Sequence, residues 1–229
     1  MGAWGTQPRS AALDARDVFP GFTRGALPAT FNWMTRPFRR ALHVDVFDAI
    51  EARRSIKRFT NREVSRDDIA RLLQAFTRAP NHRMTQPWRF YVLGPEARAA
   101  YGEALGLRKA RRVEDPEAAA AVQAKVAHEH AALPAMIAVA MVQDDNPEIR
   151  EEDYAAIFMG LQNLALAAES LGLGTHIKTG AVMDDPTARS AAGVRAGERV
   201  VAIVNVGEPA EVPNAKPRMD PDELTTWLP

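Results

Sequence analysis

Residues 79–90 read APNHRMTQPWRF, a polar loop bounded by two prolines that runs directly into an aromatic segment. Aromatic and β-branched residues are typical of strands, so we predict a strand from Trp88 to Leu93. A single histidine in such a loop, here His82, is usually a polar surface residue. The role of this loop must therefore be read from the elements and motifs around it.

Capping residues and apolar spacing define the predicted elements on either side of the loop. Asp45 is placed to cap one helix and Ser65 a second. In the second helix, Ile69, Leu72 and Phe76 are spaced as one apolar face. The order of the predicted helices and strands along the chain indicates an α+β fold, in which helices pack on a sheet, and not a regular βαβ series. The predicted helices are 45–53, 65–76, 94–107, 116–132, 148–171 and a short one after residue 186, and the predicted strands are 88–93, 136–142, 175–178 and 199–206.

The longest predicted helix, 148–171, has an unusually apolar surface. One stripe includes Ile157 and Leu164, and small or apolar residues such as Ala155 and Met159 occupy much of the remainder. Such a helix is expected to be buried on more than one side. A central helix shared with a second subunit would explain this, and burial within one subunit would explain it equally well.

The bulk composition restricts the function without assigning it. The chain has 229 residues and is 46% hydrophobic, which allows a substantial core in one domain. Its formal net charge is zero, so bulk electrostatics gives no reason to expect binding to nucleic acid or acidic membranes. Because cysteine is absent, redox chemistry would require a bound cofactor. We see neither a membrane-spanning apolar run nor a signal sequence, and we expect a cytoplasmic protein.

The chain divides into two predicted regions. Residues 1–43 mix Gly, Pro, Arg and isolated aromatic residues without a sustained period, and we predict an N-terminal arm. This arm is either a plain tail or a segment that packs on a partner subunit. The regular fold is predicted to occupy 44–229 as one domain.

Two groups of cations flank predicted elements. The segment RRSIKRF at 53–59 directly follows the first predicted helix, and Lys216 and Arg218 follow the last predicted strand. Clustered Arg and Lys side chains are suited to binding a phosphate. Either cluster alone, however, could simply be a run of charged residues on the solvated surface. A third motif, GLGTHIKTG at 172–180, enters a strand after the longest helix. It follows a helix and not a strand, so it is not a dinucleotide-binding fingerprint.

The loop at 79–90, the segment 53–59, the segment 172–180 and the two tail cations together resemble the nitroreductase family of FMN-dependent oxidoreductases. The resemblance covers about residues 45–218, in the family's order. It implies a nitroreductase-like fold with a mostly antiparallel central sheet and a long central helix. It also implies a homodimer with two FMN sites shared between the subunits.

The resemblance further implies which residues bind FMN. The segment 53–59 would contact the phosphate, ribityl chain and pyrimidine edge, and the tail would add phosphate ligands. The loop would complete the pocket of the neighbouring subunit, and the segment 172–180 would lie near flavin N5. No side chain is assigned as an acid or base, and no metal ligand is expected. The implied FMN ligands are Arg53, Arg54, Ser55, Lys57, Arg78, His82, Gln86, Ile177, Lys178, Thr179, Lys216 and Arg218.

The loop also departs from the pattern of many longer family members. Those members have a serine pair and an asparagine where this chain has Asn81, His82 and Met84. The contacts that the serines and the asparagine make in those members therefore cannot be carried over to this loop.

The resemblance implies transfer of hydride from NAD(P)H through flavin N5 to an oxidised acceptor by a ping-pong mechanism. FMN would be the bound cofactor, NAD(P)H a co-substrate, and a nitroaromatic, quinone or enone the acceptor. One alternative is a protein that binds or delivers FMN without turnover. Another is a relative that consumes its flavin or reduces a carbon–halogen bond. Such relatives differ mainly in the lid, for which the Arg- and Lys-rich segment 106–116 is the candidate.

The sequence His128-Glu129-His130 could suggest a metal site, but its spacing argues against one. Residues two apart on a helix lie about 200° apart around its axis. The two imidazoles therefore cannot share one metal ion.

Overall fold

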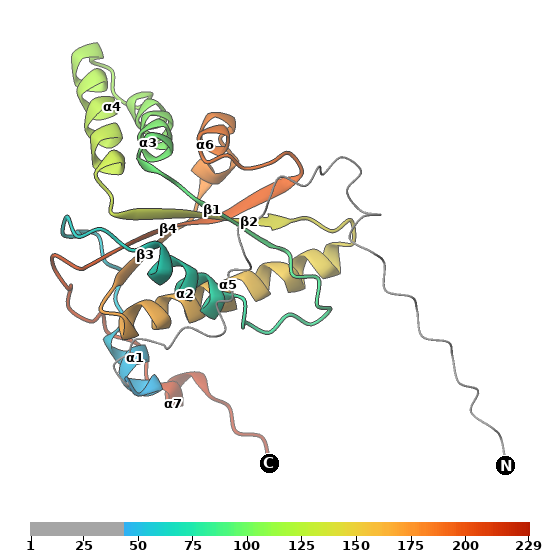
Figure 1. Ribbon diagram of the computed structural model, residues 1–229. Helices are drawn as coiled ribbons and strands as arrows, with labels where there is room; N and C mark the ends of the chain where they lie inside the picture. The colour runs from blue at the N-terminus through green and yellow to red at the C-terminus, as the bar shows by residue number, and fades with distance from the viewer. Residues whose placement is uncertain (1–43) are drawn as a thin grey trace, which may run out of the picture. The chain divides into compact units, whose positions relative to one another are not determined.

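The computed structural model describes residues 44–229, which form an α+β structure on one four-stranded sheet (Figure 1). The sheet order is β1-β2-β4-β3, and every neighbouring pair is antiparallel. The predicted fold class and antiparallel sheet are therefore confirmed. The predicted arm, 1–43, lies outside the described residues. The strands are β1 Trp88–Val92, β2 Ala135–Val142, β3 Gly174–Lys178 and β4 Glu198–Gly207.

The helices begin where the capping residues predict. The side chains of Asp45 and Ser65 accept hydrogen bonds from the backbone amides of Phe47 and Asp68, as N-caps do. Elements of four residues carry too little periodicity to be predicted, which explains why α7 and the 3₁₀ helix Ala181–Asp184 were not expected. None of the helices described is at once long and apolar enough to cross a membrane. The α-helices are α1 Val46–Ala52, α2 Arg66–Phe76, α3 Pro95–Ala110, α4 Pro116–Ala131, α5 Pro147–Ser170, α6 Pro186–Ala191 and α7 Pro221–Leu224.

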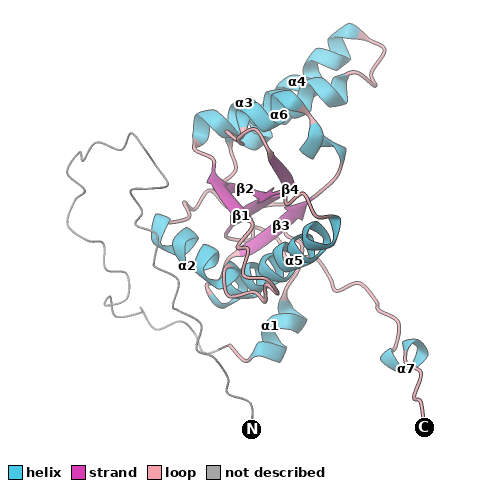
Figure 2. Ribbon diagram, turned by 90° about the vertical axis from the view of Figure 1, so that its right-hand side faces the viewer, coloured by secondary structure: helices cyan, strands magenta, loops and turns pink. Residues whose placement is uncertain are grey.

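Helices cover both faces of the sheet (Figure 2). On one face, α2 and α5 bury a cluster that includes Leu72, Phe76 and Leu161. On the other, residues of α3 and α6 bury a second cluster with Met136 and Ile203 of the sheet. Helix α4 packs against α3, and the two form a helical hairpin.

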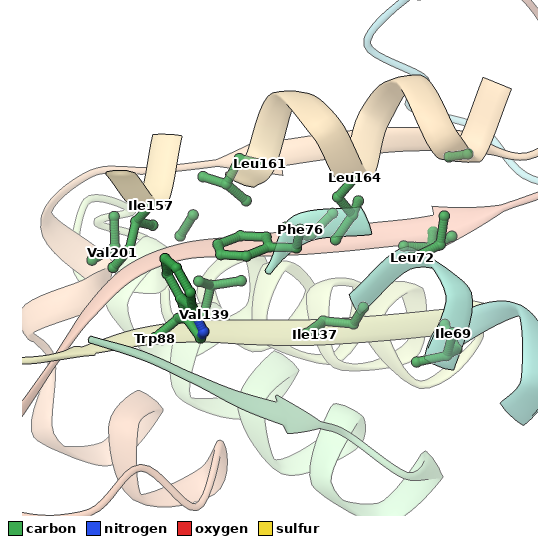
Figure 3. Close-up of a cluster of buried hydrophobic side chains, with 14 of the residues drawn as sticks. Ile69, Leu72, Phe76, Trp88, Ile137, Val139, Ile157, Leu161, Leu164 and Val201 are labelled. Atoms are coloured by element: carbon green, nitrogen blue, oxygen red, sulfur yellow. The ribbon is translucent and has the colours of Figure 1, made fainter. Parts of the chain in front are cut away.

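The first cluster fixes the position of the loop that precedes β1 (Figure 3). The ring of Phe76, at the end of α2, meets the rings of Trp88 and Phe90 edge to face, with centroids 5.9 and 4.8 Å away. Gly160 of α5 lies directly against the Phe76 ring, where a Cβ atom would collide with it. The residues on both sides of the loop, 77–87, are thus held by close packing between α2, α5 and β1.

Helix α5 is buried on one side only within the described residues. Ile157, Leu161 and Leu164 are fully buried in the first cluster, whereas Phe158 and Met159 are exposed. Packing among residues 44–229 therefore leaves part of the apolar surface of this helix exposed.

The edge strand β3 brings two distant segments together. Ser55 forms a parallel bridge with Thr175, and the amide of Ile56 donates to the Thr175 carbonyl over 2.9 Å. The amide of Thr60 donates to the carbonyl of Glu208, which directly follows β4, also over 2.9 Å. The chain after α1 therefore runs beside the start of β3 and the chain that leaves β4.

Candidate functional site

A cleft of about 910 Å³ lies between the chain that follows α1 and the chain that follows β4. Its walls come from the end of α1, the segment 53–58, Gln162 of α5 and the region 211–218. Six lining residues are Arg or Lys and only two are Glu, so positive charge dominates the walls. The structure thereby gathers six predicted ligands from opposite ends of the described chain, namely Arg53, Arg54, Ser55, Lys57, Lys216 and Arg218.

Arg54 is a half-buried cation of the cleft, and one of its donors has no partner within residues 44–229. Its Nη1 donates to the carbonyls of Glu51 and, over 3.0 Å, of Arg53, which anchors the guanidinium to the end of α1. Its Nε is buried without a hydrogen-bond partner among the described residues. A buried donor without an acceptor is costly, and an anionic oxygen at this position would remove that cost.

The other cations of the cleft are available to a ligand to different degrees. Arg58 forms an ion pair with Glu211 at the rim, so its charge is already compensated. Arg53, Lys57 and Lys216 form no ion pair with any residue in 44–229. Together with the Ser55 hydroxyl and the Arg54 Nε, they offer cations and hydrogen-bond donors, which are the kinds of group that suit a phosphate.

The loop 77–87, in contrast, is already organised by its own hydrogen bonds. Asp153 of α5 is buried and accepts from Asn81 Nδ2 over 3.2 Å and from the Thr85 hydroxyl. Asn81 Oδ1 accepts from the amide of Gln86 over 2.8 Å. These bonds hold Met84 and Gln86 in the left-handed region, at φ 51° and 47°, where non-glycine residues are uncommon. The loop conformation is therefore maintained from α5.

The exposed side of the loop is tied to α5 by charged groups. His82 Nδ1 lies 2.9 Å from Glu152 Oε1, and Arg83 Nε donates to Glu152 Oε2 over 2.9 Å. Arg83 also approaches Glu148, at 3.3 Å. The hydrogen bonds from His82 and then Arg83 lower the pKa of Glu152 below its usual range. The predicted ligands Arg78, His82 and Gln86 do not line the cleft of their own subunit.

The end of β3 places the three predicted ligands of the glycine-rich segment in different surroundings. Ile177 packs against the first hydrophobic cluster, whereas Lys178 points to the opposite face of the sheet, where its Nζ lies 3.4 Å from His130 Nε2 of α4. Thr179 is exposed just beyond the strand. None of these three residues lines the cleft.

Two residues near Lys178 were not predicted as part of a site. His130 is buried, and its Nδ1 lies 2.8 Å from the Val126 carbonyl. Asn205 of β4 pairs with His176 of β3, on the same sheet face as Lys178, and its buried Oδ1 has no partner among the described residues. The sequence does not indicate that either residue lies near Lys178. His130 was considered only together with His128, as a possible metal ligand, and Asn205 reads as one interruption of an apolar strand.

Helix α4 places the two imidazoles of His128-Glu129-His130 in different environments. His128 is exposed, whereas His130 is buried.

The Arg- and Lys-rich segment that we considered as a lid lies where α3 ends and the chain turns into α4. Arg108, Lys109, Arg111 and Arg112 line a separate cavity of about 390 Å³ there. Two of these cations, Arg108 and Lys109, lie in the last turn of α3, where positive charge interacts favourably with the negative end of the helix dipole. The lid assignment stays a prediction.

Comparison with known proteins yields a consistent set of similarities. The sequence model of the Nitroreductase family matches residues 50–208. A Bacillus subtilis (strain 168) protein, YfhC, which is named as an NAD(P)H nitroreductase, is 31% identical over 179 residues, covering 77% of this chain and 90% of its own.

Two crystal structures show the same fold. A nitroreductase-like family protein from Bacillus cereus superimposes with a TM-score of 0.71 at 28% identity, covering 82% of this chain and 98% of its own. A protein from Desulfovibrio desulfuricans, named as a nitroreductase in complex with FMN, gives a TM-score of 0.63 at 25% identity, covering 82% and 99%. The family match to residues 50–208 spans the four strands, helices α2 to α6 and the segment 53–58 of the cleft.

Proposed function

This chain belongs to the nitroreductase family, and from that premise we propose that it is an FMN-dependent oxidoreductase that uses NAD(P)H to reduce an oxidised small molecule. The observation that carries the proposal is the cleft, in which unpaired cations, a hydroxyl and the buried Nε of Arg54 converge. FMN is the cofactor named for the Desulfovibrio desulfuricans relative, and NAD(P)H the reductant in the name of YfhC.

The residues of the cleft would divide the binding of FMN between them. Arg53, Lys216 and Arg218 would neutralise the phosphate, whose charge near neutral pH is about −2. Ser55 and Arg54 would donate hydrogen bonds to the phosphate or the ribityl chain, and Lys57 would lie near the pyrimidine edge. This distribution explains how a chain with no net charge can hold a dianion at one place.

When bound, FMN supplies a ring that can take up hydride at N5 and pass two electrons on, which is the chemistry the protein lacks. We propose that NAD(P)H and the acceptor use the same face of the site in turn, in a ping-pong sequence. A nitroaromatic, quinone or enone would suit such a site as acceptor. The protein's own groups would bind FMN, orient the reactants and exclude water from the site. No side chain is assigned as acid or base.

We further propose that the functional unit is a homodimer with shared sites. Helix α1 exposes Val46, Phe47 and Ile50, and α5 exposes Phe158 and Met159. Ile50 lines the cleft, as does Gln162, one turn after Phe158 on α5. A second copy that covers this apolar surface would close one side of the cleft. The loop 77–87, which is absent from the cleft of its own subunit, would then complete the cleft of the partner.

An anaerobic titration tests this proposal. The purified protein is saturated with FMN, freed of unbound flavin, and its absorbance near the flavin bands is followed as NADPH or NADH is added. Rapid bleaching, followed by recovery of the bands after addition of a nitroaromatic or quinone, is the expected result. Bound FMN that neither nucleotide reduces at a useful rate would favour the alternative of a flavin-binding or delivery protein. Failure to bind FMN would overturn the proposal.

A further inference from the structure

Arg58 and Glu211 form an ion pair across the cleft, with Arg58 on the wall that follows α1 and Glu211 on the wall that follows β4. Both side chains are well exposed, at 74% and 54%. An ion pair exposed to this degree contributes little to the stability of a fold, because water screens the charges and two long side chains must be ordered. The pair is notable instead for the part of the chain that it holds.

Backbone hydrogen bonds fix the chain on both sides of the pair. The amide of Ala210 donates to the carbonyl of Arg58 over 3.0 Å, and the amide of Thr60 donates to the carbonyl of Glu208 over 2.9 Å. The two segments therefore have defined positions relative to each other. Glu211 follows directly after the last of these bonds.

The segment 212–218 comes next and carries the predicted phosphate ligands Lys216 and Arg218. It is exposed throughout and lines the cleft. Within residues 44–229 it forms no hydrogen bond or ion pair with any residue outside the segment. The bonds found there run from Arg218 Nη1 to backbone carbonyls of the segment itself. In the described part of the chain, the ion pair at Glu211 is therefore the last polar contact that ties the two ligands to the fold.

The composition of this segment makes its starting point important. Pro213 and Pro217 lock their own φ angles and restrict the residue before each of them. Proline-rich segments are extended and semi-rigid, and they advance by about 3.1 Å per residue. In such a stiff segment, the position of Lys216 depends on the point at which the chain leaves Glu211 and on its direction there.

We propose that Arg58 and Glu211 are positioning residues for the flavin phosphate: their ion pair sets where the segment 212–218 leaves the fold and so holds Lys216 and Arg218 at the cleft. This inference rests on the proposed function. It also explains why a phosphate site would tolerate a carboxylate in its wall. The charge of Glu211 is compensated by Arg58, and the pair brings two further cations to the phosphate.

The comparison of Glu211 with Glu51, the other carboxylate of the cleft wall, tests this role. Glu51 forms no ion pair with any residue in 44–229, so Glu51→Ala and Glu211→Ala remove the same charge, but only the second breaks a pair. If charge alone mattered, both variants would bind the phosphate of FMN more tightly. We expect Glu51→Ala to bind FMN more tightly than the wild type and Glu211→Ala to bind it about threefold more weakly. The affinity is measured by titrating the flavin-free full-length protein and following the quenching of FMN fluorescence.

Riboflavin separates an effect at the phosphate from a general defect of the cleft. It has the ring and the ribityl chain of FMN but no phosphate, so it offers Lys216 and Arg218 no anion to bind. Glu211→Ala should therefore bind riboflavin with wild-type affinity. A variant whose cleft was distorted as a whole would lose affinity for both flavins.

Reversal of the pair separates its geometry from the charge of Arg58. Arg58→Glu alone places two carboxylates at the rim and should weaken FMN binding about tenfold. The double variant Arg58→Glu, Glu211→Arg restores a pair and the net charge, and it should recover most of the wild-type affinity. Arg62→Ala is the control, because Arg62 forms a similarly exposed pair with Glu208 and does not line the cleft. It should bind both flavins as the wild type does.

The results that would contradict this inference can be told apart from failure of the proposed function. If the wild type binds FMN but Glu211→Ala binds it as tightly as Glu51→Ala, the pair does not position the phosphate ligands and the proposed function still stands. The same conclusion follows if Glu211→Ala loses affinity for both flavins alike, or if the double variant binds FMN no better than Arg58→Glu. If the wild type does not bind FMN, the proposed function fails and this inference fails with it.

Discussion

The cleft and the loop 77–87 are both polar regions rich in Arg, but their side chains are used in opposite ways. In the cleft, Arg53, Lys57 and Lys216 have no ion-pair partner in the described part of the chain, and the Arg54 Nε is buried without an acceptor. In the loop, Arg83 is paired with Glu152. Side chains that the chain leaves unsatisfied are the ones available to a ligand, and side chains that it pairs maintain conformation. Substitutions in the two regions should therefore affect different measurements.

The largest effect is expected from Arg53→Ala. Loss of a hydrogen-bonded cation from a phosphate site costs about 1.5–3 kcal/mol, which corresponds to about a ten- to hundredfold loss of FMN affinity. The affinity is measured by titrating flavin-free protein and following the quenching of FMN fluorescence. Arg62→Ala is the control, because Arg62 is paired with Glu208 and does not line the cleft. Equal losses in both variants would remove the phosphate assignment.

Asp153→Ala should instead affect the stability of the fold. Removing this buried carboxylate takes one acceptor from Asn81 Nδ2 and one from the Thr85 hydroxyl, which would then bond only to each other's side chain, and this should lower the free energy of unfolding by about 2 kcal/mol. Urea unfolding followed by circular dichroism measures the change. Glu151→Ala, at the exposed neighbouring position on α5, should have almost no effect. If the two variants unfold alike, the loop is not maintained from Asp153.

His82→Ala connects the two regions, because the loop is proposed to complete the cleft of the partner subunit. Loss of one neutral hydrogen bond would weaken FMN binding about fivefold. A mixed dimer of an Arg53→Ala subunit and a His82→Ala subunit gives the sharper result. If the cleft is shared, one of its two sites carries neither substitution and binds FMN with wild-type affinity. Two weakened sites, one with the affinity of Arg53→Ala and the other with that of His82→Ala, would mean that Arg53 and His82 do not meet across the interface.

The parts of this architecture that could be predicted are those encoded locally. The helices that begin after Asp45 and Ser65 could be predicted, because a capping side chain contacts amides only two or three residues away. The apolar run of β2 likewise needs no partner to be recognised. By contrast, the convergence of Ser55 with Lys216 was expected only through the resemblance to a family, since no local pattern indicates that they share a cleft.

Contacts between residues far apart in the sequence could not be predicted. Asp153 looks like any charged residue of a helix, and its bonds to the loop span about seventy residues. The face on which Lys178 lies depends on the register of β3 with β4, which places it on the side of α4. His130 lies beside Lys178 only because α4 folds back over α3, and no local sequence pattern indicates that contact.

The smallest predicted effect concerns pH and the exposed side of the loop. Hydrogen bonds from His82 and Arg83 depress the pKa of Glu152 in the folded protein below its ordinary value of 4.5. A carboxyl group whose pKa is depressed in the folded state stabilises the fold at pH values above its unfolded-state pKa. This stabilisation is lost as the pH falls through the folded-state pKa.

Glu152→Gln should therefore be less stable than the wild type at pH 6, and the difference should shrink as the pH is lowered below about 4.5. Urea unfolding of both proteins between pH 3 and pH 6 measures this. Because Glu152 is partly exposed and water screens its pairs, the difference should be smaller than that caused by Asp153→Ala; a difference that persists unchanged at pH 3 would show that Glu152 acts through packing and not through charge.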